Sequence, residues 1–160
     1  MQELLTSFAN WIQNTPVGLA VGGTLWGFPF VQLIHFFGLS IWVGTIVMVD
    51  LRLLGLAGKN ESATQLAKNL TPWTWTGLAI VVTGGALLFS ASAKTYVLNA
   101  AFRVKFPLLL AGIAYHYFMQ RSVPKWDRPG GIPAVAKLAG VVEMAIWIGV
   151  ITAAVNIPNY

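Results

Sequence analysis

Two histidines stand in otherwise apolar sequence, and their ring nitrogens are the chain's clearest means of doing chemistry. His35 lies within FVQLIHFFGLSIWVGTIVMVDLRLLGL, residues 30–56. Ionisable side chains inside apolar spans are costly and mark functional sites by default. A neutral imidazole ligates haem iron or another metal, or carries a proton. A third reading is that the ring only hydrogen-bonds a neighbouring helix.

The residues around His35 favour haem ligation. Gly38, one helical turn later, leaves room for a flat macrocycle, although close helix packing explains a glycine there equally well. Trp42 lies a further turn along. Arg103 and Lys105, in AAFRVK, are expected on the same outer side, where they either anchor a helix at the interface or bind porphyrin propionates. We therefore predict a b-type haem site formed by His35, Gly38, Trp42, Arg103 and Lys105.

A second polar layer is expected around His116, which follows Tyr115 and precedes Tyr117. Imidazole and thioether groups together suit a soft ion such as Cu(I). An alternative copper site therefore consists of Met48, His116, Met119 and Met144. Methionines in apolar helices also serve simply as packing residues, and His116 could be a hydrogen-bonding residue between helices.

Three charged residues belong to this inner layer. Asp50 and Arg52 end the first apolar segment, where we expect an interfacial ion pair or a helix-end anchor. Glu143 lies six residues after Lys137 in the last segment. A buried acid needs a partner, and Arg52 or His116 is the simplest choice.

The two histidines are expected at different depths. His35 lies fifteen residues before Asp50, or about 22 Å from that end of a helix at 1.5 Å per residue. His116 lies five residues before Arg121, or about 7–8 Å from the same side. One haem held between both rings is therefore not expected. The second axial position is empty, comes from a neighbouring subunit, or involves His116 only if the helices are strongly displaced.

Composition places most of this chain in lipid. Only 9% of its 160 residues are charged and 56% are hydrophobic, with a mean hydropathy of +0.68. Soluble domains carry about a quarter charged residues. About 20 mostly apolar residues span the hydrocarbon as a helix, and four segments qualify, about 27–48, 75–92, 103–120 and 138–156.

The predicted fold is all-α, an integral membrane four-helix bundle forming a single domain over residues 1–160. Residues 1–15 carry apolar side chains at helical spacing. They predict an amphipathic helix at the membrane interface, or one packed on the rest of the protein. No cleavable signal peptide is expected, because the N-terminus lacks a basic region and a small-residue cleavage site.

The basic residues predict the orientation. Seven of the ten Lys and Arg fall in the first and third connections and three in the second. Basic loops face the cytoplasm, so both termini are expected outside the cytoplasm. The net charge of +5 is then explained by the basic loops that orient the protein in the membrane, and not by nucleic-acid binding.

Several function classes are excluded by missing motifs. The chain has no cysteine, which excludes disulfides, thiolate metal sites and covalently attached c-type haem. It contains no Ser/His/Asp set, no H-E-x-x-H zinc motif and no phosphate-binding glycine loop. No catalytic residues can be assigned from the sequence.

The stretch HFFGLSIWVGTIVMVDLRLLGL resembles the first span of an uncharacterised family of small four-helix bacterial inner-membrane proteins, in the pattern H-x-x-G-x-x-x-W-x-G-x-x-x-x-x-D-L-R-L-L-G. The later TPW, TGG-x-L-L-F and AFR-x-K segments are similar too, so the resemblance covers most of the chain. More distantly, the span is similar to membrane-type protoporphyrinogen oxidases and copper-resistance D-type membrane domains. The oxidase resemblance implies that His35 ligates haem b.

Together these observations predict a membrane protein that binds b-type haem and takes part in electron transfer, within a homo-oligomer or a larger redox complex. Copper binding or transport is one alternative. A cofactor-free structural subunit, whose histidines only connect helices, is the other.

Overall fold

The computed structural model describes residues 2–159, which are helical along most of their length and include no β-strand. The all-α class is therefore confirmed. The helices are α1 Gln2–Gln13, α2 Pro16–Gly22, α3 Gly27–Leu53, α4 Ala63–Ala91, α5 Ala93–Leu98, α6 Ala100–Trp126, α7 Ala134–Val155 and the short 3₁₀ helix η1 Ile157–Asn159.

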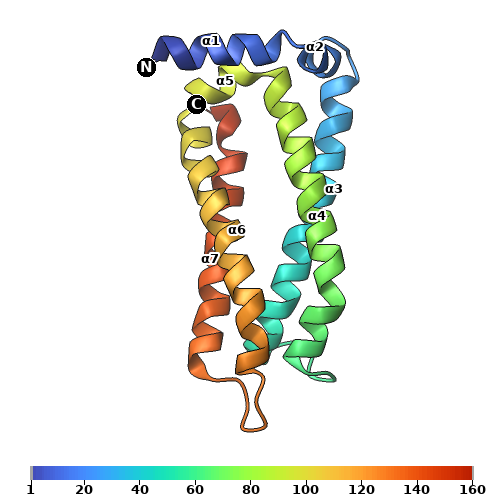
Figure 1. The fold of residues 1–160 in the computed structure, drawn as a ribbon, viewed down its shortest axis with the longest axis vertical. Coiled ribbons are helices and arrows are strands. Elements are labelled where there is room, and N and C mark those ends of the chain that lie inside the picture. Colours follow the sequence, from blue (N-terminus) through green and yellow to red (C-terminus); the bar gives the residue numbers. More distant parts are fainter. Residues whose placement is uncertain (1, 160) are drawn as a thin grey trace.

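The four long helices α3, α4, α6 and α7 run alongside one another, and the short helices α1, α2 and α5 lie across one end (Figure 1). Helix α1 and the end of α7 with η1 lie at this capped end. The connections α3–α4 and α6–α7 lie at the opposite end, here called the loop end. The seven basic residues assigned to the first and third connections therefore gather there, at Arg52, Lys59, Lys68, Arg121, Lys125, Arg128 and Lys137.

Three of the long helices, α3, α4 and α7, are long and apolar enough to cross a membrane. Helix α6 matches α3 in length, but its more polar composition leaves it outside this group. The helices also extend beyond the expected spans, most clearly at α4, which begins at Ala63 instead of about 75. Its first turns are polar, and the sequence places them in the connection before the span of about 75–92. They form a helix because the Ser62 hydroxyl accepts a hydrogen bond from the Gln65 amide.

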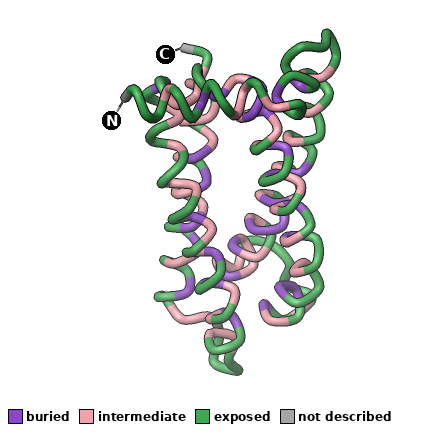
Figure 2. Tube along the Cα trace, turned by 45° about the horizontal axis from the view of Figure 1, so that its top comes forward, coloured by how far each residue is buried: buried purple, intermediate pink, exposed green. Residues whose placement is uncertain are grey.

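The helices associate in two pairs, α3 with α4 and α6 with α7. A cluster of buried residues joins all four helices near the loop end and includes Leu53, Ala67, Val123 and Ala136. A second cluster around Trp42 and Trp147, which includes Val81, joins α3, α4 and α7 at mid-height. In the half nearer the capped end the two pairs diverge, and the tube view shows them apart (Figure 2).

Glycines allow α3 and α4 to lie in close contact. A Cβ atom at Gly77 would lie 2.7 Å from the backbone nitrogen of Trp42. One at Gly38 would lie 2.6 Å from Cγ2 of Ile80 and 3.0 Å from the backbone nitrogen of Val81. Small residues permit such approach of helix backbones in membranes. The space at Gly38 is thus filled by α4, and the prediction that Gly38 leaves room for a macrocycle is wrong.

The loop end is held together by Asp127. Its carboxylate accepts a hydrogen bond of 2.8 Å from the Thr64 amide, which connects the end of α6 to the start of α4. Burial alone would raise the pKa of Asp127, but hydrogen bonds from Thr64 and Ser62 and the charge of Arg52 outweigh it and lower the pKa below its ordinary value. The carboxylate therefore remains charged at neutral pH and holds the two connections together.

The contact between α3 and α4 predicts a difference between two alanine substitutions. We expect Gly77→Ala to reduce the free energy of unfolding by about 1–3 kcal/mol, because the added methyl group meets backbone that cannot move aside. Gly44→Ala is the matched control, since a Cβ there meets nothing within 4 Å. Thermal unfolding of both variants in detergent measures the difference. Equal stability of the two would contradict the close contact.

Candidate functional site

His35 lies on α3 and packs against α4. Its Nδ1 lies 2.9 Å from the carbonyl oxygen of Val81. A carbonyl oxygen only accepts hydrogen bonds, so Nδ1 donates the proton, and in the neutral imidazole the lone pair then lies on Nε2. Among the described residues no hydrogen bond to Nε2 is found. The ring is thus fixed in the tautomer whose other nitrogen is free to ligate a metal.

Two adjacent glycines of α4 make room for this ring. A Cβ atom at Gly84 would lie 3.0 Å from Cβ of His35, and one at Gly85 would lie 3.3 Å from its Cε1. Any larger residue at either position would press on the imidazole. The glycines that make room for His35 are therefore on the neighbouring helix. The residues next to His35 in the sequence could not indicate them.

Two cationic side chains, Arg103 and Lys105, are predicted at the His35 site, and only Lys105 interacts with His35. Lys105 on α6 is half-buried and interacts electrostatically with the ring. Arg103 is exposed. Residues two positions apart on a helix point about 200° apart, so the two side chains cannot converge on one ligand from the same helix.

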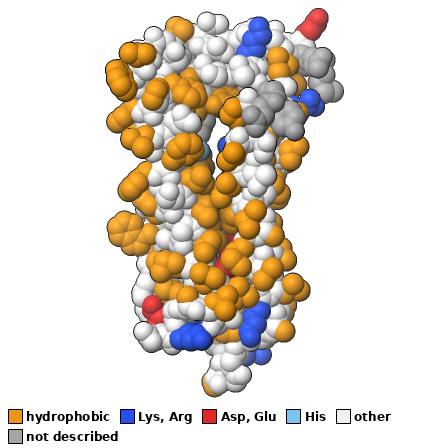
Figure 3. Space-filling view, turned by 180° about the vertical axis from the view of Figure 1, so that it is seen from behind, with side chains coloured by type: hydrophobic (Ala, Val, Ile, Leu, Met, Phe, Trp, Pro, Cys, Tyr) orange, Lys and Arg blue, Asp and Glu red, His pale blue; other side chains and the backbone are white. Residues whose placement is uncertain are grey.

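An opening lies between the two helix pairs on the side of the capped end. Figure 3 shows the molecule hollowed there, with a basic side chain at the edge of the opening. His35 belongs to the α3–α4 pair and Lys105 to the α6–α7 pair. Their electrostatic interaction therefore acts between the pairs.

Trp42 does not belong to the His35 layer. It is completely buried, and its ring centroid lies 5.0 Å from that of His116 and 5.4 Å from that of Trp147. Trp42 follows His35 by seven residues, which is about 10 Å along the helix. The prediction of Trp42 as a haem contact beside His35 is therefore wrong, and His116 lies about that distance nearer the loop end than His35.

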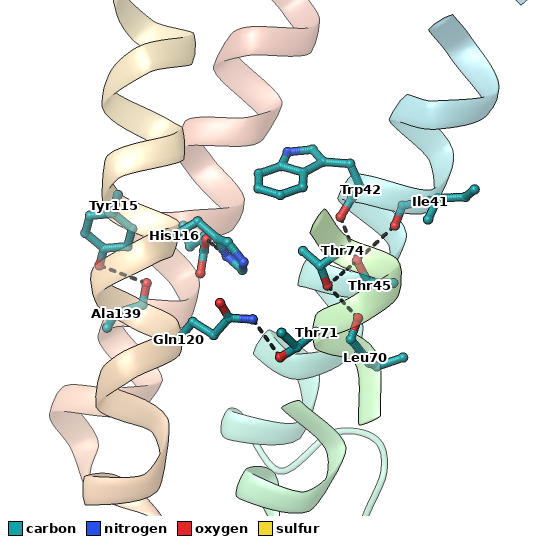
Figure 4. Close-up of polar contacts among 11 residues, drawn as sticks. Ile41, Trp42, Thr45, Leu70, Thr71, Thr74, Tyr115, His116, Gln120 and Ala139 are labelled. Carbon is teal, nitrogen blue, oxygen red and sulfur yellow. Dashed lines mark hydrogen bonds and ion pairs between the residues drawn. The ribbon is translucent and has the colours of Figure 1, made fainter. Parts of the chain in front are cut away.

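His116 forms a buried pair with Glu143, as one of the two predicted pairings requires. Nδ1 of His116 lies 2.7 Å from Oε1 of Glu143. Both side chains are buried between α6 and α7. Figure 4 shows His116 pointing from α6 toward the interior at the level of Trp42.

The expected ion pair between Asp50 and Arg52 is absent. Arg52 donates from Nε to the carbonyl oxygen of Glu61, 2.9 Å away. Asp50 is only 1% exposed and faces Gly140 of α7, whose absent Cβ would lie 3.3 Å from Oδ1. Two residues apart on one helix, the side chains point in opposite directions. Arg52 thus reaches the α3–α4 connection while Asp50 points into the bundle.

Hydroxyl and amide groups extend the polar layer across the bundle. Thr74 of α4 donates to the Thr45 hydroxyl of α3, and Gln120 of α6 donates to the Thr71 hydroxyl (Figure 4). A small cavity of about 10 Å³ lies among them. Its lining includes Thr45, Thr74, His116, Met119, Gln120 and Glu143. Sequence reasoning missed Thr45, Thr74 and Gln120, because isolated hydroxyl and amide residues in a helix carry no pattern.

The structure does not assemble the full copper set. Met119 and His116 line the same cavity, but the side chain of Met48 is 50% exposed. Within residues 2–159, no three His, Asp or Glu side chains are grouped so that they could hold a metal ion.

Membrane-length apolar helices around a buried polar layer are the features of a helical membrane protein. The chain belongs to a family of unknown function, DUF6644, which it matches over residues 5–158. None of the curated proteins and none of the solved structures compared with the chain matches it.

The His116–Glu143 pair generates a stability prediction. We expect Glu143→Leu to reduce the free energy of unfolding by about 3–5 kcal/mol, because it leaves the buried imidazole without its partner. Glu143→Gln keeps an oxygen acceptor there and should cost clearly less. Unfolding in detergent compares the variants, with the exposed Glu3→Leu as control. If the Leu and Gln variants lose the same stability, the hydrogen bond does not hold this layer together.

Proposed function

We propose that this protein is an integral membrane protein that binds one b-type haem through His35 and takes part in electron transfer. The observation that carries the proposal is the hydrogen bond from Nδ1 of His35 to the Val81 carbonyl. It fixes the ring tautomer and leaves the Nε2 lone pair available, the arrangement used by histidines that ligate metals. Haem, when bound, supplies one-electron redox chemistry.

The membrane placement rests on the helices. We propose that α6 crosses the inner membrane together with α3, α4 and α7, since it matches α3 in length and runs beside α7 (Figure 1). The loop end, with its seven basic residues, then faces the cytoplasm and both termini lie outside. Helix α1 exposes Leu4, Leu5, Phe8 and Trp11 while it buries Ala9. This exposed apolar face supports a position at the membrane interface.

The surroundings of His35 suit a large planar ligand with acidic groups. An opening lies between the helix pairs (Figure 3), and the absence of side chains at Gly84 and Gly85 leaves room for the His35 ring against α4. Lys105, on the other pair, can hold a carboxylate of the ligand. Arg103 is left to anchor α6 at the interface.

One chain offers a single histidine ligand at this level, because His116 is bonded to Glu143 and lies nearer the loop end. A second axial ligand, where there is one, comes from another subunit. This supports the proposal that the protein acts as a homo-oligomer or within a larger redox complex.

The decisive measurement is the absorption spectrum of the purified protein. We expect a Soret band in the wild type that disappears in His35→Ala, because the substitution removes the ligating nitrogen. His116→Gln is the matched control and should keep the band, since that ring is engaged elsewhere. A colourless wild type without porphyrin by mass spectrometry would end the proposal.

The same samples separate the alternatives. Copper binding has one observation in its favour, the shared cavity of Met119 and His116. Copper found by elemental analysis, lost in His116→Gln and kept in His35→Ala, would favour that function. A double histidine variant that assembles and supports normal function would favour a cofactor-free structural subunit.

Lys105 and Arg103 give a second test of the site. Lys105→Gln should weaken haem affinity about 10- to 150-fold, since a hydrogen bond to a charged group contributes about 1.5–3 kcal/mol. Arg103→Gln should change it little, because that side chain is exposed and turned away. Titration of the haem-free protein with haem, followed at the Soret band, compares the two. Equal losses of haem affinity in the two variants would show that Lys105 contributes no more to haem binding than Arg103 does.

A further inference from the structure

One face of α6 is exposed and changes from apolar to basic along its length. Its apolar part includes Leu110, which is 53% exposed, and Phe118, which is 67% exposed. Its basic part lies on the last turns before the loop end, where the side chains are also exposed. At 3.6 residues per turn, all of these positions fall within about 100° of one another around the helix. This face, here called the α6 stripe, comprises Leu110, Ala114, Tyr117, Phe118, Arg121 and Lys125.

The Arg121 side chain turns back along the helix, away from the loop end. Its Cζ lies over the ring of Tyr117, 4.2 Å from the ring centroid. Tyr117 precedes Arg121 by four residues, which is about 6 Å along the helix toward the middle of the bundle. The contact with the ring therefore holds the guanidinium beside the apolar part of the stripe, where its charge is accessible from the side of the helix.

No acidic side chain neutralises the basic end of the stripe. Helix α6 contains four basic residues and no Asp or Glu. Among the described residues, no ion pair or hydrogen bond involves the side chain of Arg121 or Lys125. Asp127, just beyond α6, is bonded to the Thr64 amide. Arg128 adds a third cation, because its Nε donates to the Lys125 carbonyl oxygen, 2.8 Å away. The end of the stripe therefore favours an anion from outside the chain.

The length of the apolar part matches one leaflet of a membrane. Arg121 follows Leu110 by eleven residues, which is about 16 Å along the helix. The hydrocarbon of one leaflet is about 15 Å deep, half of the bilayer core. A phospholipid whose phosphate contacts Arg121 therefore has an acyl chain of the right length to lie beside Phe118 and end near Leu110. A free anion would contact only the basic end of the stripe, whereas a phospholipid covers both parts.

We propose that the α6 stripe binds an anionic phospholipid, with its phosphate held by Arg121 and Lys125 and one acyl chain lying along the apolar part. Arginine and lysine donate strong, charge-assisted hydrogen bonds to phosphate oxygens. The anionic class follows from the charge of the site, since the ammonium group of a zwitterionic lipid is repelled by the cations at this end. The inference rests on the proposed crossing of the membrane by α6 and is independent of haem.

Competition between two lipids tests this site. The full-length protein in detergent is mixed with equal amounts of phosphatidylglycerol and phosphatidylcholine, and native mass spectrometry identifies the lipid that remains bound. We expect one phosphatidylglycerol to be retained in preference to phosphatidylcholine. The double variant Arg121→Gln, Lys125→Gln should lower the affinity for phosphatidylglycerol about 25-fold, at about fivefold for each cation removed.

Lys137→Gln is the matched control, because Lys137 is also an exposed cation at the loop end. A Cβ atom at Gly112 of α6 would lie 3.0 Å from Cγ2 of Ile146, so Ile146 faces α6. Lys137 precedes Ile146 by nine residues and therefore points about 180° away from α6. Its substitution should leave the lipid preference unchanged.

Three results would overturn the lipid site. They are equal binding of the two lipids by the wild type, equal losses in the control and the double variant, and displacement of phosphatidylglycerol by an excess of inorganic phosphate. The last result would show that the apolar part of the stripe contributes nothing to binding.

Reconstitution in nanodiscs separates this proposal from the membrane placement. Nanodiscs are formed with each lipid alone, and incorporation of the protein is measured by gel filtration. A chain that enters neither kind of nanodisc would overturn the membrane placement and the lipid site together. A chain that enters both, but shows no preference in the competition, would overturn the lipid site alone. Neither measurement depends on a haem spectrum.

Discussion

The close contact between α3 and α4 is the constraint on which the rest of the molecule depends. Because Gly38 and Gly77 have no side chain, the two backbones approach until the atoms of one helix fill the space beside the other. This approach puts the Val81 carbonyl within hydrogen-bond distance of His35 and the Thr74 hydroxyl within reach of Thr45. The tautomer of His35 and one side of the buried polar layer thus follow from the same packing.

The other pair contributes a different kind of interaction. Helices α6 and α7 are held at mid-height by the bond between His116 and Glu143, while Trp42 packs edge-on against both His116 and Trp147. The two histidines are therefore used differently, one against a backbone carbonyl and one against a carboxylate.

Much of the fold could be predicted from composition and apolar length, including the helical class and the common side of the termini. The polar start of α4 could not, because its helix depends on the Ser62 cap and on packing near the loop end. The difference in depth between His35 and His116 could be predicted by counting residues along the helices. The surroundings of Gly38, Trp42 and Asp50 could not be predicted, because they depend on which neighbouring helix each residue faces.

The divergence of the helix pairs toward the capped end leaves the bundle open on one side (Figure 2, Figure 3). The pairs are joined near the loop end, and α1, α2 and α5 cover the far end (Figure 1). The opening between them is on the side of the bundle (Figure 3). A molecule enters this opening from the side of the bundle, between the two pairs, and not through the end that α1, α2 and α5 cover.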